Sequence, residues 1–370
     1  MAMDLDHFLA SSAEIARRKG PHDRIVLSSR VRLARNLRGA PFPGWAKKHD
    51  KVRVLEQVRP AIEALPEMAE CYSGTMDNIS VLDKNILVER HLISREHAAK
   101  GVGSGLVLNR DETFCFMINE EDHLRMQTLR PGLQLREAWA AIDHADTLLE
   151  QALDYAYDTD FGYLTACPTN LGTGARVSAM LHLPGLVIAE QITPIIQSVN
   201  RLGLAVRGLY GEGTEALGNV FQVSNQMTLG ETEADIVQRL EKVLAQIIEN
   251  EENARDMLIE KRPKMVYNHV GRAYGILANA HTISSKETMN LLSLMRLGSD
   301  LSLFSGMDRG LVDELFILTQ PAHLQKQQVG KLNAEERDLI RADMVRERLR
   351  NVSRPVARPA GGGGAGKTAE

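Results

Sequence analysis

The chain has 370 residues, 44% hydrophobic and 25% charged, so it can bury a sizeable core, and its length predicts two domains. Its net charge of -4 provides no general attraction to nucleic acid or an anionic membrane, and we expect neither as a partner. Three scattered cysteines without C-x-x-C spacing, Cys71, Cys115 and Cys167, argue against a disulfide framework or a cysteine-based zinc site and indicate the reducing cytoplasm. No run reaches the roughly 18 apolar residues that span a bilayer, so we expect no membrane insertion or export.

The first part of the chain intersperses strand-like and helical patterns. Residues 4–19 are typical of a short amphipathic helix, and residues 21–37 alternate like a half-buried strand. Further strand-like runs cover residues 79–93, 104–119, 162–170, 206–213 and 219–227, and helical runs cover 135–155, 176–184 and 187–203. This mixture predicts an α/β or α+β domain.

The pattern changes after Glu231. Ile236, Leu240, Val243, Ile247 and Ile248 fall on one helical face, and residues 285–298 stay helical. We therefore expect an all-helical domain from about Lys264, ending in a charged helix at 333–350. The predicted division is an N-terminal helical segment (1–23), a first domain (24–255), a helical domain (264–350) and a disordered tail (351–370).

The tail contains "GGGGAGKT", Gly361–Thr368, which matches the phosphate-binding pattern G-x-x-x-x-G-K-[ST]. Such a loop binds phosphate only between a strand and a helix, because the helix N-terminus directs its N–H groups at the anion. Pro-rich and Arg-rich residues precede this stretch and only Ala369 and Glu370 follow it. We interpret it as a flexible tail.

Three stretches concentrate residues whose burial is costly without a ligand. In "SSRVR", Ser28–Arg32, two arginines two apart on a strand project to one face and suggest a shared anion, although a solvated outer face has the same pattern. In "NEEDHLR", Asn119–Arg125, three consecutive carboxylates, Glu120, Glu121 and Asp122, indicate a base or a cation clamp. His123 is more consistent with a structural residue than with a catalyst.

The third stretch is "CPTNLGTGAR", in which Cys167 is predicted to end a strand and Gly172 and Gly174 to open a turn toward a helix. Glycines there allow close approach of a phosphate to the backbone, and Arg176 adds charge. Cys167 is either a buried apolar side chain or a thiol activated by neighbouring arginines.

These stretches, with "RGLYGEG" further on, supply several arginines and two separated acids, Glu121 and Glu212. Arginines with Mg²⁺ match a nucleoside triphosphate, and two carboxylates match a cationic acceptor. The arginines are Arg30, Arg32, Arg125, Arg176 and Arg207.

In order and spacing, these motifs resemble the catalytic domain of the phosphagen (guanidino) kinases over about residues 24–255. The resemblance implies an α+β fold with a mainly antiparallel sheet flanked by helices, followed here by an all-helical C-terminal domain. It implies ATP with Mg²⁺ as cofactors, with no protein residue assigned as a metal ligand. The implied ATP-binding residues are Ser28, Ser29, Arg30, Val31, Arg32, Arg90, His91, Arg125, Arg176, Val177, Ser178, Ala179, Met180, Arg207, Gly208, Leu209, Tyr210 and Gly211.

By the same resemblance, Glu121 and Glu212 grip the guanidinium of the acceptor, and Cys167 is the reactive cysteine beside it. A guanidinium is a poor nucleophile while protonated, so transfer requires a base, for which Glu121 is our candidate.

Within the family, the chain is most similar to the bacterial kinases that phosphorylate arginine side chains of proteins. Only residues 1–27 precede "SSRVR", too few for the helical lid that encloses free arginine or creatine in small-molecule kinases, so we expect a protein substrate. The motif "RDLIRA", Arg337, Asp338, Leu339, Ile340, Arg341 and Ala342, matches the phosphoarginine-sensing motif of those kinases. Its spacing alone is more typical of a solvated helix face.

The resemblance further implies a homo-oligomer, an activator protein, and a role in marking proteins for proteolysis or regulating a repressor. Two alternatives stay open: a kinase of free arginine, and an inactive protein that binds phosphoarginine.

Overall fold

The computed structural model describes residues 5, 19–208 and 216–356. An eight-stranded sheet forms its centre, with strand order β2-β3-β4-β5-β1-β8-β10-β9 and antiparallel pairing throughout. The strands are β1 (Val26–Arg35), β2 (Cys71–Thr75), β3 (Gly105–Asn109), β4 (Phe114–Ile118), β5 (Leu124–Pro131), β8 (Ala175–His182), β9 (Leu204–Gly208) and β10 (Val220–Asn225). A separate hairpin joins β6 (Tyr157–Asp158) to β7 (Gly162–Tyr163).

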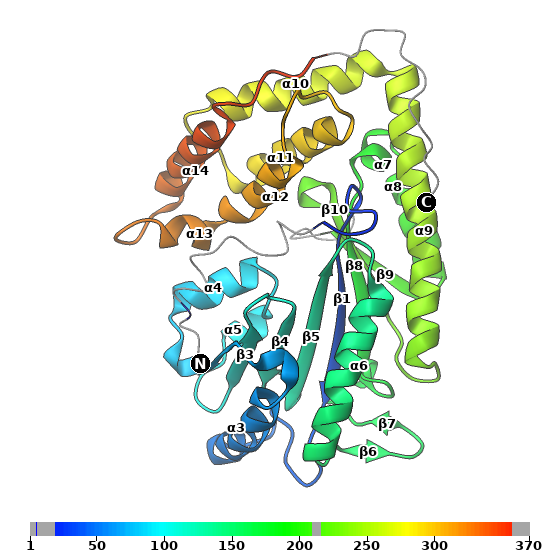
Figure 1. Ribbon diagram of the computed structural model, residues 1–370, viewed down its shortest axis with the longest axis vertical. Helices are drawn as coiled ribbons and strands as arrows, with labels where there is room; N and C mark the ends of the chain where they lie inside the picture. Colours follow the sequence, from blue (N-terminus) through cyan, green and yellow to red (C-terminus); the bar gives the residue numbers. More distant parts are fainter. Residues whose placement is uncertain (1–4, 6–18, 209–215, 357–370) are drawn as a thin grey trace.

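Helices cover one face of this sheet (Figure 1). Apolar side chains of β1 such as Val31 and Leu33 pack there with those of the helices into the larger core. The opposite face is free of these helices and carries the polar side chains of the same strands. The covering helices are α3 (Lys48–Glu63), α6 (Leu135–Ala152), α8 (Ile192–Arg201) and α9 (Glu233–Lys261).

At one edge of that opposite face, α4 (Val81–Glu89) and α5 (Arg95–Ala98) pack on β3 and β4 through a small core that includes Ile86, Leu87 and Met117. A short helix, α7 (Pro184–Ile188), follows β8.

The C-terminal helices gather at the end of the sheet where β1 begins (Figure 1). They enclose a second core, which starts with Leu258 of α9 and includes Val270, Leu292 and Leu315. The helices are α10 (Pro263–Asn279), α11 (Ser285–Asp300), α12 (Arg309–Leu318), α13 (Pro321–Lys326) and α14 (Ala334–Leu349). The expected α+β class, with a helical C-terminal region, is confirmed.

Three predicted elements are wrong. Within residues 79–93, Val81–Glu89 form helix α4 instead of a strand, and Ser80 caps this helix by accepting a hydrogen bond from the N–H of Asp83. Residues 176–182 form the central strand β8 rather than a helix, because neighbouring strands pair with both of its edges. Cys167 precedes a 3-10 turn at Pro168–Asn170 instead of ending a strand.

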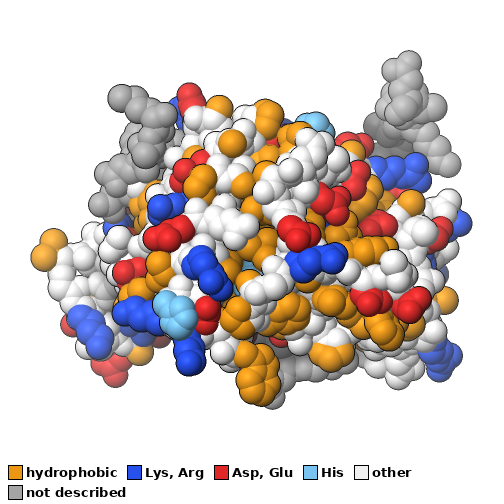
Figure 2. Space-filling model, turned by 90° about the horizontal axis from the view of Figure 1, so that it is seen from below, with side chains coloured by type: hydrophobic (Ala, Val, Ile, Leu, Met, Phe, Trp, Pro, Cys, Tyr) orange, Lys and Arg blue, Asp and Glu red, His pale blue; other side chains and the backbone are white. Residues whose placement is uncertain are grey.

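Among the described residues, no helix combines the length and apolar character needed to cross a membrane. The end of the molecule formed by α3 and the β6–β7 hairpin mixes basic, acidic and hydrophobic side chains (Figure 2).

Candidate active site

The predicted arginines lie on the face of the sheet opposite α3, α6, α8 and α9, which we call the open face or arginine face. Side chains two apart on a strand share a face, so Arg30 and Arg32 project together from β1. Their partners in register on β8 are Ser178 and Arg176, and Arg125 enters from β5 opposite Ala34. Arg207 extends the group on the edge strand β9, where it pairs with Gln222 of β10.

Arg30, Arg32 and Arg176 are poorly neutralised, whereas Arg125 forms an ion pair with Glu120. Within the part of the chain that the structure describes, Arg30 donates to neutral groups alone, at 2.6 Å to Gln222 Oε1 and 3.4 Å to Ser178 Oγ, and Arg176 donates at 3.4 Å to Ser224 Oγ. Among the described residues, Arg32 has no ion pair, and the Nε atoms of Arg32 and Arg176 are buried without a hydrogen-bond partner. Such a cluster is stabilised by a bound polyanion.

Burial and mutual repulsion lower the pKa values of this cluster. Burial, followed by Arg125 and Arg176, lowers the pKa of Arg30 to about 10. Burial and the neighbouring arginines lower the pKa of Arg32 well below its usual value, and burial and Arg207 lower that of Arg176. Each shift means that the folded chain disfavours the charged form until a counter-charge binds.

Strand alternation divides the "SSRVR" and "RVSAM" stretches between two faces. Ser28, Ser178 and Met180 lie on the arginine face, in register across β1 and β8. The side chains of the remaining four lie on the opposite, helix-covered face: Ser29, Val31, Val177 and Ala179. Ser29 is tied there by a hydrogen bond from its Oγ to Gly132 O.

Arg90 and His91 occupy the end of α4. His91 adopts φ 60° because it terminates the helix: its N–H donates to Val88 O, and the N–H of Leu92 donates to Leu87 O. Burial, with a smaller effect of Arg30, lowers the pKa of His91 to about 4, so its ring is neutral at pH 7. Arg90 is buried and forms an ion pair with Glu112 at 2.6 Å.

The three predicted carboxylates have different environments. Burial raises the pKa of Glu120, but the ion pair with Arg125 at 2.8 Å and hydrogen bonds from Ser94 Oγ and the Glu121 N–H outweigh it and hold this pKa at about 2. Glu121 is exposed, and burial of part of its carboxylate together with Asp122 and Glu120 raises its pKa. Glu121 is therefore the member of the cluster suited to accept a proton.

Asp122 and His123 are structural. Asp122 Oδ1 accepts hydrogen bonds from Asn36 Nδ2 at 2.6 Å and from the Ala166 N–H at 2.7 Å, which fixes the segment next to Cys167. His123 Nδ1 accepts from the Leu37 N–H at 3.0 Å, and its Nε2 lies 3.0 Å from Pro41 O. The structural interpretation of His123 is consistent with these bonds.

Cys167 lies in the segment that leads into β8, the strand of Arg176, and its Sγ is 3.0 Å from Thr169 Oγ1. The neighbouring glycines have a different role from the expected one. A Cβ on Gly172, at φ 103°, would lie 2.4 Å from Thr228 O, and one on Gly174, at φ 64°, 2.6 Å from Ala34 O. They permit close backbone packing in front of a strand.

Several predicted residues fall outside the described part of the chain. Leu209, Tyr210, Gly211 and Glu212 follow Gly208, the last residue of β9, and the tail stretch Gly361–Thr368 lies beyond residue 356.

The "RDLIRA" stretch lies on α14, and its two arginines differ. Arg341 is 1% exposed and donates to Thr319 O, Ile283 O and Asp338, so the solvated-face alternative is wrong for it. Arg337 is half-buried, donates to Leu332 O, and lines a hollow bordered by α4, α11 and α13. Leu339 is exposed, Ile340 is half-buried, and Ala342 packs in the second core.

Two side chains of the candidate site, Gln222 and Asn36, were not predicted from the sequence. Gln222 fixes Arg30, and alternation along β10 would have placed it on the arginine face. Asn36 supports Asp122 across a long separation in sequence, for which the sequence contains no signal.

Comparison with known proteins assigns the family. The profile of the ATP:guanido phosphotransferase C-terminal catalytic domain matches residues 53–254, and that of the protein-arginine kinase McsB C-terminal domain matches residues 263–360. The chain is 45% identical over 346 residues to the protein-arginine kinase of Halothermothrix orenii, covering 94% of this chain and 97% of that one. It is 44% identical over 350 residues to that of Bacillus subtilis, covering 94% and 96%. The chain belongs to the protein-arginine kinases of the ATP:guanido phosphotransferase family.

Solved structures of the wider family share the fold. A duplicated taurocyamine kinase from Schistosoma mansoni aligns with a TM-score of 0.57 and 26% identity, over 64% of this chain and 35% of that one. A lombricine kinase aligns with a TM-score of 0.55 and 24% identity, over 68% and 71%.

Within the described residues, no group of three or more His, Cys, Asp or Glu side chains is arranged to hold a metal ion. The arginine face fits the phosphates of ATP, whose oxygens would carry Mg²⁺.

Proposed function

We propose that the chain transfers the γ-phosphoryl group of ATP to arginine side chains of proteins. The observation that carries this proposal is the row of poorly neutralised arginines on the open face of the sheet, with the exposed Glu121 at its edge. The protein-arginine kinases to which the chain is similar over nearly its whole length support the same reaction.

The arginines bind the triphosphate. Arg30, Arg32, Arg125, Arg176 and Arg207 provide cations along the face, and the unpartnered Nε atoms of Arg32 and Arg176 are donors for phosphate oxygens. Mg²⁺ bound to the phosphate oxygens would further neutralise the transferring phosphoryl group. Because these charges are fixed before ATP arrives, they stabilise the transition state without reorganising.

Glu121 orients and activates the acceptor. Its carboxylate accepts N–H bonds from the guanidinium and removes one proton as nitrogen attacks the γ-phosphorus. The new P–N bond forms while the bond from phosphorus to the β,γ-bridging oxygen breaks, and ADP leaves with that electron pair. Glu212, by family resemblance, grips the same guanidinium, and Cys167 lies beside it.

The substrate and regulation follow from the family as proposals. A protein-bound arginine reaches the site from the exposed side of Glu121, in the cytoplasm, and phosphorylation marks the protein for proteolysis or inactivates a repressor. Arg337, on the hollow beside α4, senses phosphoarginine, and α4 carries His91 to the arginine face. We further propose a homo-oligomer and an activator protein.

The test compares ATP consumption with free arginine and with an unfolded arginine-rich protein, followed by mass spectrometry of acid-labile phosphoarginine. Transfer to the protein, absent in Glu121→Gln, is expected. Transfer to free arginine alone would favour a phosphagen kinase, and binding of phosphoarginine without any transfer would favour an inactive regulator.

A further inference from the structure

The open face of the sheet changes character along the strands. At the end near the C-terminal helices, four largely apolar side chains from adjacent strands line one pocket and form a diagonal row across the sheet: Leu129, Ser28, Met180 and Val220. Two residues further along β1 comes Arg30, which pairs in register with Ser178 and donates to Gln222 Oε1, and two further comes Arg32, in register with Arg176 and Gln127.

This change from apolar side chains to arginines along β1 matches the chemistry of one kind of molecule. Ser28 and Arg32 are four residues apart on β1, so at about 3.3 Å per residue the apolar row lies about 13 Å from the outer arginines. A nucleoside triphosphate has a flat, largely apolar base at one end and a polyanion at the other. Its base therefore belongs over Ser28 and Met180 when its phosphates contact the arginines.

The apolar row is not open to solvent, because helices of the C-terminal region cover it. The pocket above Ser28 is lined both by strands of the sheet and by helices of the C-terminal region. Its opposite wall includes the apolar side chains of Met289 from α11 and of Phe316 and Ile317 from α12, beside polar side chains of the same region: Arg296, Arg309, Asp313 and Gln320. The base would thus lie between the sheet and the helical domain.

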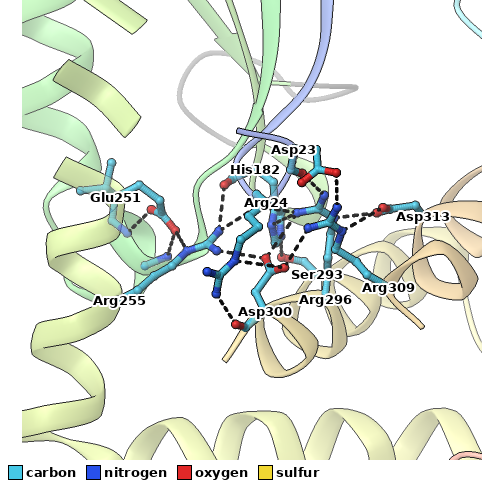
Figure 3. Close-up of polar contacts among 12 residues, drawn as sticks. Asp23, Arg24, His182, Glu251, Arg255, Ser293, Arg296, Asp300, Arg309 and Asp313 are labelled. Carbon is cyan, nitrogen blue, oxygen red and sulfur yellow. Dashed lines mark hydrogen bonds and ion pairs between the residues drawn. The ribbon is translucent and has the colours of Figure 1, made fainter. Parts of the chain in front are cut away.

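Ion pairs hold this wall in place (Figure 3). Arg296 of α11 donates to Asp23 O and Arg24 O at 2.8 Å and pairs with Asp313 of α12 at 2.6 Å. Arg309 of α12 pairs with Asp23 at 2.7 Å. Both helices are therefore fixed to the residues just before β1, a few positions from Ser28.

A buried histidine completes the junction. His182, at the end of β8, lies 2.8 Å from Ser293 Oγ and 3.2 Å from Arg296 Nη1. The wall is thus tied to two of the central strands, and its spacing from the sheet is set by the fold.

We propose that the C-terminal domain forms half of the nucleobase pocket, with Ile317 and Phe316 packing on the base of ATP. This rests on the proposed nucleotide site and adds a specificity-determining surface to it that lies outside the catalytic domain. Nucleotide binding then bridges the two domains, whereas the phosphates alone contact only one.

The test measures binding of ADP and of inorganic tripolyphosphate by calorimetry to full-length variants. Ile317→Ala is expected to weaken ADP about tenfold, equivalent to about 1.4 kcal/mol, because apolar contact with the base is lost. Tripolyphosphate, which has no base, should bind unchanged. Ile317→Phe, which fills the pocket, should weaken ADP further and also spare tripolyphosphate.

Leu318→Ala is the matched control, because Leu318 is the next residue of α12, is also half-buried, and does not line the pocket. It should leave both affinities unchanged. Equal ADP affinities in the wild type, Ile317→Ala and Ile317→Phe would overturn this inference alone, as would parallel losses of both ligands in the Ile317 variants. Failure of the wild type to bind ADP would instead overturn the proposed function.

Discussion

The two arginines of the "RDLIRA" helix should respond very differently to truncation. Arg341→Ala removes hydrogen bonds to Thr319 O at 2.9 Å and Ile283 O at 2.8 Å, together with the ion pair to Asp338. Arg337→Ala removes one bond, to Leu332 O, from a half-buried side chain. The pair is matched in residue type, helix and substitution.

The magnitudes follow from these contacts. Hydrogen bonds to charged groups contribute about 1.5–3 kcal/mol each, and breaking a buried ion pair costs about 3–5 kcal/mol, with the contributions not additive. We therefore expect Arg341→Ala to lower the free energy of unfolding by about 3–5 kcal/mol. The loss in Arg337→Ala should be about 1 kcal/mol or less, because water replaces its single bond.

Urea unfolding of the full-length variants measures the difference, and transfer rates against added phosphoarginine measure the function. Arg337→Ala should keep basal transfer but lose stimulation by phosphoarginine. The main effect of Arg341→Ala should be a lower free energy of unfolding. Equal unfolding free energies would refute the assignment of Arg341 as a structural residue, and unchanged stimulation in Arg337→Ala would refute its sensing role.

Three further predictions concern the catalytic edge. Burial and Asp122 raise the pKa of Glu121, so its inactive protonated form persists to higher pH than for an ordinary glutamate, and activity should fall as the pH drops through that value. Asp122→Asn keeps an oxygen for both hydrogen bonds but removes the charge, and should shift the acid limb of the pH-rate profile to lower pH; an unmoved limb would exclude Glu121 as the titrating base. Cys167 should react with iodoacetamide faster than Cys115, whose pKa is raised by burial, and ATP should slow the reaction; equal rates without protection would make Cys167 structural. Gly174→Ala should destabilise the fold by at least about 1–2 kcal/mol, because it places a Cβ against Ala34 O at positive φ, and an unchanged melting temperature would contradict this.

Local patterns predicted much of the arginine face. Alternation in "SSRVR" places Arg30 and Arg32 on one side of a strand, and the apolar stripe of residues 236–248 predicts α9. Both signals depend only on neighbours in the sequence, so they are independent of the tertiary packing around these elements.

The errors came where packing or capping decides the structure. Residues 176–182 contain Ala, Met and Leu, which favour helix, yet they lie in the middle of the sheet. The apolar residues of 79–93 favoured a strand, although Ser80 and Asp83 are a recognisable start of a helix. The helical wall over Ser28 could not be predicted, because Ser28 and the wall residues Met289, Phe316 and Ile317 are more than 250 positions apart in the sequence.

Helix α9 belongs to both cores. Its 29 residues extend about 44 Å, with Ile236 to Ala254 packed against the sheet and Leu258 in the helical domain. Arg262 alone separates it from α10, and Arg255, near its end, pairs with Glu251 and with Asp300 of α11. Any rotation of the helical domain against the sheet must therefore bend α9 or change the backbone dihedral angles at Arg262. The unbroken helix α9 thus limits how far a cavity between the sheet and the helical domain can widen.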